Sequence, residues 1–446
     1  MATKKKILTT TLAVRNYFNG FLHNQSIGGI VLVICAAIAL LCANVPQLHF
    51  VQELWETNMT ISIGSFCLDM SLEQWINDAL MAIFFFVVGL EIKREMMVGE
   101  LSSFKHAALP ILAAVGGMVV PAIIYACFNY NNPDSISGWG IPMATDIAFA
   151  LGVLSLLGNR TPLGLKIFLT ALAIVDDLGA IIVLAIFYPT HALHFDMLLY
   201  AAIVVLFLFA LNRSGVNKRW PYGILGIVLW YFVFQSGIHA TISGVILALT
   251  IPSKTVINEV RFSVGMKYWL EKFKEHSNSQ VEVLANPEQQ HIIHQIGASA
   301  RNMNPLMHRF EASLHPWVTF FIMPVFALAN AGVAISGDLF SLPLPSVALG
   351  IFFGLLCGKP IGIFLFSFIA VKSGIAELPS GTRWKQIFAL GIIAGIGFTM
   401  SIFVDGLAFA DQQLINIGKV AILCTSLVAA ILGCAAVYVT SSGEKK

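Results

Sequence analysis

Long runs of apolar residues, separated by short polar stretches, recur along most of the chain. A transmembrane helix needs about 20 consecutive, mostly apolar residues to cross a bilayer. Twelve stretches approach that length: residues 27–45, 76–91, 108–127, 140–158, 163–188, 193–211, 221–236, 238–251, 317–336, 345–371, 384–409 and 416–440. We therefore expect an all-α polytopic membrane protein with twelve transmembrane helices.

These spans divide the chain into membrane and water-exposed parts. The predicted parts are a cytoplasmic N-terminus (1–26), spans one to eight (27–251), a cytoplasmic loop (252–316), spans nine to twelve (317–440) and a cytoplasmic tail (441–446). The loop is too polar to span, and its pattern predicts two amphipathic helices near 262–274 and 288–300.

Between the first two spans the pattern changes from helical to alternating. Residues 59–63 and 66–70 alternate apolar and polar side chains around Gly64-Ser65. A two-residue loop with glycine first is typical of a type II′ turn, so this segment predicts a small extracytoplasmic β-hairpin at 59–70. A single hairpin is only marginally stable in water, so we expect it to pair with another surface.

The distribution of positive charge tests this segmentation. Of the 26 Lys and Arg residues, all but Lys359 and Lys419 fall at one side of the predicted membrane. Cytoplasmic loops are enriched in Lys and Arg, so both termini are expected in the cytoplasm of a bacterium, with the spans in its inner membrane.

Composition excludes several classes of protein. The chain is 57% hydrophobic and 11% charged, whereas a soluble domain has roughly 25% charged residues. A soluble globule and a disordered chain are therefore excluded. The net charge of +2 leaves no basic excess that would indicate a nucleic-acid partner. The expected surroundings are the lipid bilayer.

Several ionisable residues fall inside the predicted spans. A charged side chain at the bilayer centre costs about 2.5–3.5 kcal/mol on insertion scales, so it indicates function. The deepest are Asp176 and Asp177 in the fifth span, Asp146 in the fourth and Lys359 in the tenth, while Asp78, Glu91 and Asp405 lie nearer span ends. One lysine cannot neutralise three deep carboxylates, so at least one of them must exchange a mobile cation or a proton.

The residue types indicate which ions bind. Na⁺ and Li⁺ are hard cations that prefer oxygen ligands, carboxylates above all. Desolvation and like charge both disfavour ionisation of the neighbouring Asp176 and Asp177, so we expect them to titrate as a coupled pair. A site that holds either protons or a cation, and that opens to each side in turn, performs antiport.

Breaks in two spans support an ion site near the membrane centre. Pro142 interrupts the fourth span just before Thr145 and Asp146, and Gly395 and Gly397 interrupt the eleventh. Broken helices expose half-helix ends, positive at the N-terminus and negative at the C-terminus. We expect Asp146 to compensate the positive ends and Lys359 the negative ends.

Five motifs then show a resemblance to a known family. They are Met-Ala-Thr-Asp-Ile-Ala-Phe-Ala (143–150), Ala-Ile-Val-Asp-Asp-Leu-Gly-Ala-Ile (173–181), Gly-Leu-Glu-Ile-Lys-Arg-Glu (89–95), Gly-Lys-Pro-Ile-Gly (358–362) and His-Ala-Thr-Ile-Ser-Gly (239–244). Together they resemble the NhaA sodium/proton antiporters over about residues 15–440. Paired broken helices are themselves a known feature of this family, so they add no independent support.

The resemblance implies a fold and a set of roles. The implied fold has inverted repeats of spans three to five and ten to twelve, with the broken fourth and eleventh helices crossing. The implied ion and proton ligands are Asp176 and Asp177, the latter the main cation ligand. Thr145 and Asp146 match the residues at the crossing, and Lys359 the lysine that pairs with Asp176.

Further roles follow from the same resemblance. The residues that match those of the pH response are Glu91, Arg94, Glu95, His239, Glu311 and His315, and Asp78 also has a counterpart. The hairpin matches the family's homodimer contact. Two departures, Ala312 where another histidine is expected and the long 252–316 loop, bear on the pH profile and not on the transport chemistry.

The expected function is therefore secondary transport without a cofactor. Cytoplasmic Na⁺ or Li⁺ would leave in exchange for external protons by alternating access, in an electrogenic and pH-regulated cycle. An intramembrane aspartyl enzyme is an alternative, with Asp146 and Asp177 as its dyad, but it leaves Asp176 and Lys359 without a role. A passive cation channel is the other alternative, which a flux assay separates from coupled exchange.

Overall fold

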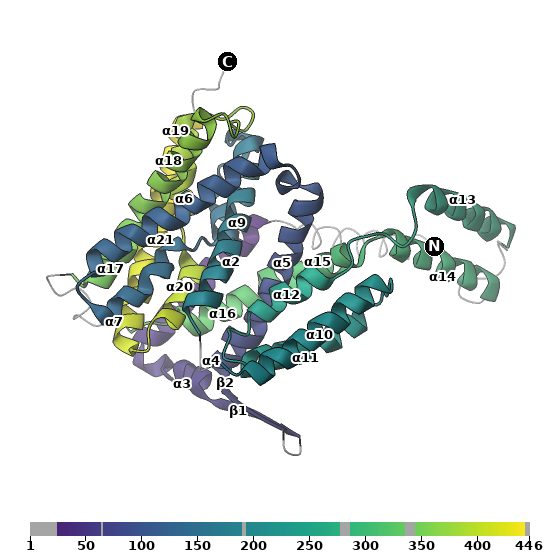
Figure 1. Ribbon diagram of the computed structural model, residues 1–446, viewed down its shortest axis with the longest axis horizontal. Coiled ribbons are helices and arrows are strands. Elements are labelled where there is room, and N and C mark those ends of the chain that lie inside the picture. The colour runs from purple at the N-terminus through teal and green to yellow at the C-terminus, as the bar shows by residue number, and fades with distance from the viewer. Residues whose placement is uncertain (1–24, 64–65, 190–192, 277–285, 335–343, 442–446) are drawn as a thin grey trace, which may run out of the picture.

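The computed structural model describes residues 25–63, 66–189, 193–276, 286–334 and 344–441 of the 446-residue chain. The predicted turn at Gly64-Ser65 and nearly all of the predicted N-terminal and C-terminal segments lie outside these residues. The described helices pack side by side, with a helical pair projecting at one side and a hairpin at another (Figure 1).

The first part of the described chain leads from the first span to the first broken one. Its elements are α2 (Gln25–Asn44), α3 (Phe50–Glu56), β1 (Asn58–Ile63), β2 (Phe66–Ser71), α4 (Leu72–Gln74), α5 (Met81–Val98), α6 (Phe104–Asn129), α7 (Pro133–Ile136) and α8 (Ile147–Leu156). A π-helical turn, Trp75–Leu80, joins α4 to α5, and a 3₁₀ segment, Ser137–Met143, precedes the break before α8.

The second part contains the remaining spans and the polar connection. Its helices are α9 (Leu163–Phe187), α10 (Phe195–Arg213), α11 (Arg219–Gln235), α12 (Ile242–Thr250), α13 (Glu259–Glu275), α14 (Pro287–Met303), α15 (Leu306–Trp317), α16 (Met323–Asn330), α17 (Ser346–Phe353), α18 (Lys359–Lys372), α19 (Trp384–Ala394), α20 (Phe398–Ala408) and α21 (Gln412–Ser441). Two π-helical turns, Val318–Ile322 and Gly354–Gly358, join α15 to α16 and α17 to α18.

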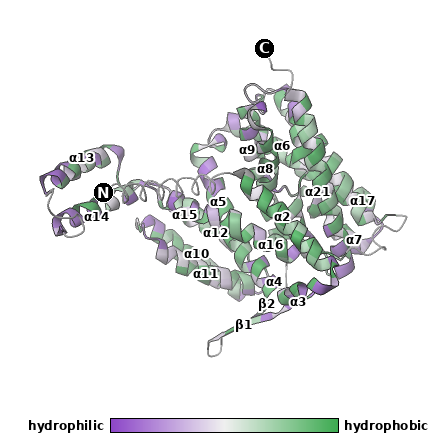
Figure 2. Ribbon diagram, turned by 180° about the vertical axis from the view of Figure 1, so that it is seen from behind, coloured by the Kyte–Doolittle hydropathy of each residue, from purple (hydrophilic) through white to green (hydrophobic). Residues whose placement is uncertain are grey.

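The described residues contain eight helices long and apolar enough to cross a membrane, or ten if each of two bent pairs is one span. Many large apolar side chains on their outer faces are exposed, as lipid-facing residues are. Hydrophobic residues cover these helices, whereas α13 and α14 carry more hydrophilic ones (Figure 2). The chain is therefore a multi-pass helical membrane protein.

One predicted span is shorter as a helix than the sequence pattern indicated. The seventh, predicted over 221–236, corresponds to α11, which has 17 residues, but the eighth, predicted over 238–251, corresponds to α12, which has only nine. Gly237 has a φ of 86°, and the following residues form turns until α12 begins at Ile242. The predicted helical range 238–251 was therefore too long at its start.

Two other boundaries differ because polar helical extensions were assigned to loops. The second predicted span, 76–91, is part of a helix from Leu72 to Val98, so Asp78 and Glu91 lie within it rather than at its ends. The ninth begins at Leu306, not at 317, and ends at Asn330. Its polar start is helical because it packs against α5, so the predicted loop 252–316 ends earlier.

The predicted hairpin and the two loop helices are confirmed. Strands β1 and β2 pair antiparallel, with Asn58 opposite Ser71 and Ile63 opposite Phe66. The Thr60 hydroxyl donates to Asp69 across the pair at 2.7 Å. Asn258 and Asn286 cap α13 and α14 by accepting backbone N–H groups, which satisfies donors that a helix start leaves free.

Candidate functional site

The adjacent aspartates of α9 point in different directions. Successive residues of an α-helix are rotated by about 100°, so Asp176 and Asp177 cannot share one set of neighbours. Both are buried, with 2% and 1% exposure. Asp176 faces α18 and the break before α8, whereas Asp177 faces a cavity on another side of α9.

Asp176 belongs to a fully buried ion pair. The Lys359 ammonium lies 2.6 Å from Asp176 Oδ2 and also donates to the Thr145 hydroxyl. Thr145 in turn is 2.5 Å from the same Asp176 oxygen. Asp176 Oδ2 therefore has two donors, while its Oδ1 has no hydrogen-bond partner among the described residues.

Close packing of α18 against α6 holds Lys359 at this depth. A Cβ on Gly116 would collide with the Gly362 carbonyl, and one on Gly362 with the Gly116 carbonyl. Gly358 approaches Pro121 in the same way, at 2.9 Å from its added Cβ to the Pro121 Cα. Only glycine permits such close backbones, which explains the glycines on both sides of the lysine.

The two interrupted spans contact each other at their breaks. The chain bends by 47° between Met143 and Ile147 and by 51° between Ala394 and Phe398. The Asp146 N–H donates to the Ile396 carbonyl at 2.8 Å. This bond pairs two backbone groups that a broken helix would otherwise leave unsatisfied in the membrane.

The Thr145 and Asp146 side chains complete this junction. Thr145 Oγ1 also lies 3.1 Å from the carbonyl of Ala394, the last residue of α19, so its single O–H can donate either to that carbonyl or to Asp176. Asp146 caps α8 by accepting from the Phe149 N–H at 2.9 Å. It also accepts from the Thr399 N–H at 3.2 Å and from the Thr399 hydroxyl, at the start of α20.

Asp146 therefore lies at the positive ends of two half-helices, where a carboxylate is favoured. Lys359 is arranged differently from the sequence prediction. Its ammonium bonds Asp176 and Thr145 rather than a half-helix carbonyl, and Thr145 satisfies the end of α19 in its place. The sequence did not identify Thr399, although its position just after Gly395 and Gly397 was the available signal.

Asp177 is the carboxylate without a partner. Neither of its oxygens has a hydrogen-bond partner among the described residues, and the side chain lines a cavity of about 150 Å³. Thr170, Ile174 and Asp177 lie on one face of α9 and form one wall, and Asp146 lies in the opposite lining. Water in the liquid occupies about 30 Å³ per molecule, so this cavity has room for a cation and a few waters.

Charged residues of the predicted pH-response group form the far end of this cavity. Glu91, Arg94 and His315 line it together with the aspartates. Arg94 pairs with Glu311 at 2.7 Å and with Glu95 at 3.1 Å, which connects α5 to the polar start of α15. The structure therefore brings five of the six predicted residues together.

The sixth of these residues and Asp78 lie elsewhere. His239 is buried, with Nδ1 at 3.0 Å from the Thr241 hydroxyl and its ring edge-on to Phe403. Neither His239 nor Asp78 lines the cavity. The backbone carbonyl of Asp78 accepts from the Trp230 indole at 3.1 Å.

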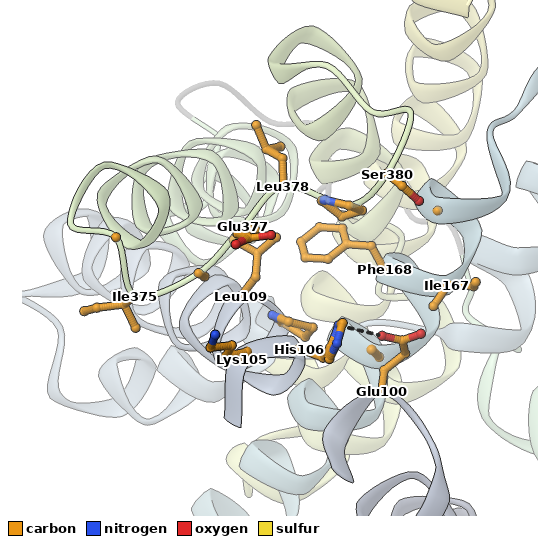
Figure 3. A pocket seen from close by; sticks show the side chains of 16 residues that line it. Glu100, Lys105, His106, Leu109, Ile167, Phe168, Ile375, Glu377, Leu378 and Ser380 are labelled. Atoms are coloured by element: carbon orange, nitrogen blue, oxygen red, sulfur yellow. Dashed lines mark ion pairs between the residues drawn. The ribbon is translucent and has the colours of Figure 1, made fainter. Parts of the chain in front are cut away.

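A larger cavity of about 500 Å³ lies apart from the aspartates. Charged side chains of Glu100, Lys105, His106 and Glu377 surround it, with Glu100 and His106 3.9 Å apart (Figure 3). Three of these are exposed and Glu100 is only half-buried, so water screens their charges. Size alone therefore does not identify the ion site.

Comparison with known proteins gives a consistent result. A model of the family described as Na⁺/H⁺ antiporter 1 matches residues 19–437. An Na⁺/H⁺ antiporter NhaA of Wolinella succinogenes is 48% identical over 413 residues, covering 93% of this chain and 91% of the relative. The corresponding proteins of Oleidesulfovibrio alaskensis and Helicobacter acinonychis are 48% and 46% identical, over 93% and 97% of this chain and 92% and 97% of their own lengths.

Proposed function

The chain belongs to the Na⁺/H⁺ antiporter 1 family and is an Na⁺/H⁺ antiporter, not an enzyme, and from this premise we propose how its buried carboxylates perform the exchange. Asp177 is the main ligand of Na⁺ and carries a proton when the cation is absent. Support comes from its two oxygens, which lack hydrogen-bond partners among the described residues and face a cavity. A buried carboxylate without compensation is unfavourable, so this group needs an ion.

The remaining cation ligands come from the same cavity. Asp146 lies in its lining, and waters complete the oxygen shell that a hard cation prefers. Among the described residues, no three His, Cys, Asp or Glu side chains form a group that holds a metal ion. The cation is therefore bound by few protein ligands, as suits cargo that must leave again. Li⁺, which also prefers oxygen, would use the same site.

Asp176 and Lys359 supply the second proton of the cycle. When Asp176 is charged, Lys359 balances it at 2.6 Å. When a proton neutralises Asp176, the lysine is released. Two acids that load protons, and one monovalent cation that displaces them, move one net charge per cycle. Exchange is then electrogenic and driven by the proton gradient.

The junction of the two broken spans is the element that moves in alternating access. Among the described residues one backbone bond, from Asp146 to Ile396, joins the two breaks, so the half-helices can rotate about it without unfolding. The fourth and eleventh spans meet there, and α6 of the third packs along α18 of the tenth. Both pairings suit inverted repeats of spans three to five and ten to twelve.

The cluster of Glu91, Arg94, Glu95, Glu311 and His315 regulates access to this site by pH. Glu91 is coupled electrostatically to Glu311, Arg94 and Glu95, so a change of charge at one of them alters the others. The cluster shares the cavity with Asp177. Protonation there changes the potential at the ion site directly. His239 acts separately, through α20, and Asp78 is a further site residue.

The full topology has twelve spans in the bacterial inner membrane, with α11 and α12 as the seventh and eighth. Both termini and the 252–316 connection lie in the cytoplasm, which suits the Lys and Arg distribution. The hairpin of β1 and β2 projects away from the packed helices (Figure 1); it lies on the extracytoplasmic side and forms a homodimer by pairing with its copy. Within the described residues the sheet has two strands, so each strand has one unpaired edge for this contact.

The observation that carries this proposal is the partnerless Asp177 in a cavity shared with Asp146. It is tested by the response of a preformed ΔpH in everted vesicles to Na⁺, Li⁺ and K⁺. We expect Na⁺ and Li⁺ to collapse ΔpH and K⁺ to have little effect. A rate that increases with an imposed potential establishes electrogenic exchange. Na⁺ conductance without proton movement would instead indicate a channel.

A further inference from the structure

A second buried carboxylate lies outside the site described above. Asp405 of α20 has no exposed surface, and neither of its oxygens has a hydrogen-bond partner among the described residues. It faces α21 at Gly418, where an added Cβ would lie 2.7 Å from the Asp405 Cγ. The absent side chain at Gly418 thus provides the space that the carboxyl group fills.

The charged and titratable groups around Asp405 are few. Lys419 of α21 and Tyr125 of α6 are the ones coupled to it electrostatically. Lys419 is itself buried, and no ion pair joins it to Asp405 in the described structure. The Tyr125 hydroxyl is occupied by donation to the Ser135 carbonyl at 2.7 Å. A charged Asp405 would therefore be uncompensated here, which favours the neutral, proton-bearing form.

A second polar pocket lies beside α21, next to the residue that Asp405 faces. Lys419 lines that pocket, of about 210 Å³, together with Glu56, Glu73 and Asn416. Glu73 stands near the start of the helix Leu72–Val98, and Glu91, which lines the Asp177 cavity, lies 18 residues or about 27 Å further along it at 1.5 Å per residue. This pocket and the Asp177 cavity therefore open at opposite ends of the membrane domain.

Polar groups connect Asp405 to the break. Ser401, one turn before Asp405 on α20, donates to the Ile141 carbonyl at 2.9 Å. The Phe398 N–H donates to the Ser426 hydroxyl of α21 at 3.1 Å. Thr399, six residues or about 9 Å from Asp405 along the helix, bonds Asp146. Three hydroxyl side chains, of Ser401, Thr399 and Ser426, thus lie on α20 and the facing α21 between Asp405 and the break.

We infer that Asp405 binds a proton and relays it between this second pocket and the carboxylates at the crossing. The O–H bond of its carboxyl group breaks as an O–H bond forms on a water or hydroxyl nearer the crossing. Lys419 then approaches to balance the charge, and a proton from the pocket restores the neutral acid. The inference rests on the proposed function, because only proton-coupled exchange needs such a path.

Right-side-out vesicles test this, because the external medium then contacts the hairpin side. We expect Asp405→Asn to retain the wild-type dependence on internal Na⁺ but to lose exchange selectively when external protons are scarce. One pH unit is a tenfold change in proton concentration, so the exchange rate of Asp405→Asn should fall about tenfold for each unit by which the external pH is raised. At acidic external pH the rate should approach that of the wild type.

A matched control separates relay from packing. The double variant Asp405→Ala/Gly418→Ala removes the carboxyl group and adds one methyl group, at residue 418, in the space that it leaves. We expect it to fold and to show the same selective loss as Asp405→Asn. External pH profiles equal to the wild type in both variants, or rates lowered equally at every pH, would overturn the relay. A wild type that exchanges no Na⁺ for protons would instead refute the proposed function.

Discussion

Two buried carboxylates on different sides of α9 differ in their hydrogen-bond partners. On one side Asp176 is held by Lys359 and Thr145. On the other side Asp177 has no hydrogen-bond partner among the described residues, and it faces a cavity. Spacing along the chain does not distinguish these two adjacent aspartates, and only the family resemblance predicted different partners for them.

The comparison separates structural charge from exchangeable charge. A carboxylate with several donors is stabilised by them, so replacing those donors with a dehydrated cation gains little. A carboxylate without donors has its full capacity free for an ion. In the proposed cycle the free side therefore exchanges the cation, whereas the partnered side fixes the crossing of the broken helices and exchanges only a proton, at Asp176. Variants on the two sides should accordingly fail in different ways.

The largest effect on transport is expected at Asp177. Asp177→Asn keeps the shape and removes the charge that binds the cation, so Na⁺-driven collapse of ΔpH should be lost. Thermal stability should stay near that of the wild type, because no hydrogen bond is broken among the described residues. Wild-type exchange in this variant would remove Asp177 from the site. Asp69→Asn in the exposed hairpin is the matched control and should exchange normally.

On the partnered side, Lys359→Ala should affect stability more than function. The substitution leaves Asp176 buried without its cation, and such truncations cost about 3–5 kcal/mol. Asp176 can become neutral by taking a proton, which must leave before a cation binds. We therefore expect a lower melting temperature and exchange that persists but is shifted to alkaline pH. Lys359→Arg should retain both properties.

A double-variant cycle tests whether the pair itself is responsible. Asp176→Asn combined with Lys359→Ala should be less unstable than the sum of the two single variants, because each single variant already removes their contact. Additive changes in melting temperature would show that the two groups do not interact. Wild-type stability and pH profile in Lys359→Ala would refute the role given to the lysine.

A smaller effect is expected from the cluster at the end of the cavity. Glu311→Gln removes a charge that Arg94 binds at 2.7 Å, so the positive charge of Arg94 is less compensated. Ionisation of Glu91, in the same cavity, is then favoured. The active range should move to more acidic pH by on the order of one unit, with the maximal rate preserved. An unchanged profile would place pH response elsewhere, and Glu311→Asp is the control.

The smallest effect on transport is expected from the hairpin. Deleting 59–70 removes both strands and leaves the residues of the crossing and the cavity in place. The protein should become monomeric in mild detergent while ΔpH collapse continues at near the wild-type rate. A dimer that survives the deletion would show that the contact lies on another surface.

Apolar run length and motif spacing were sufficient to predict most helices and the charged residues of the site. Twelve predicted spans all contain helix, although α12 is much shorter than predicted because Gly237 and the turns after it delay its start. The start of the ninth span was missed because a polar sequence is also helical when a neighbour pairs its charges, as Arg94 pairs Glu311. Local pattern contains no information about that neighbour.

Side-chain contacts between segments that are distant in the sequence could not be predicted either. Thr399 bonds Asp146 across 253 positions, and Thr145 stands between Lys359 and Asp176. Neither contact follows from spacing along the chain. The role expected of Lys359 at half-helix carbonyls was wrong in its contacts for this reason, since Thr145 occupies the carbonyl of Ala394.

The most direct test of the account is Na⁺-induced proton release from the purified protein in weakly buffered detergent solution. Titration with Na⁺ should displace protons from the wild type, because one carboxylate site holds either ion. Asp177→Asn should release none, whereas Lys359→Arg should release them as the wild type does. Equal proton release by Asp177→Asn and the wild type would show that cation and proton do not compete at Asp177, and would contradict the account.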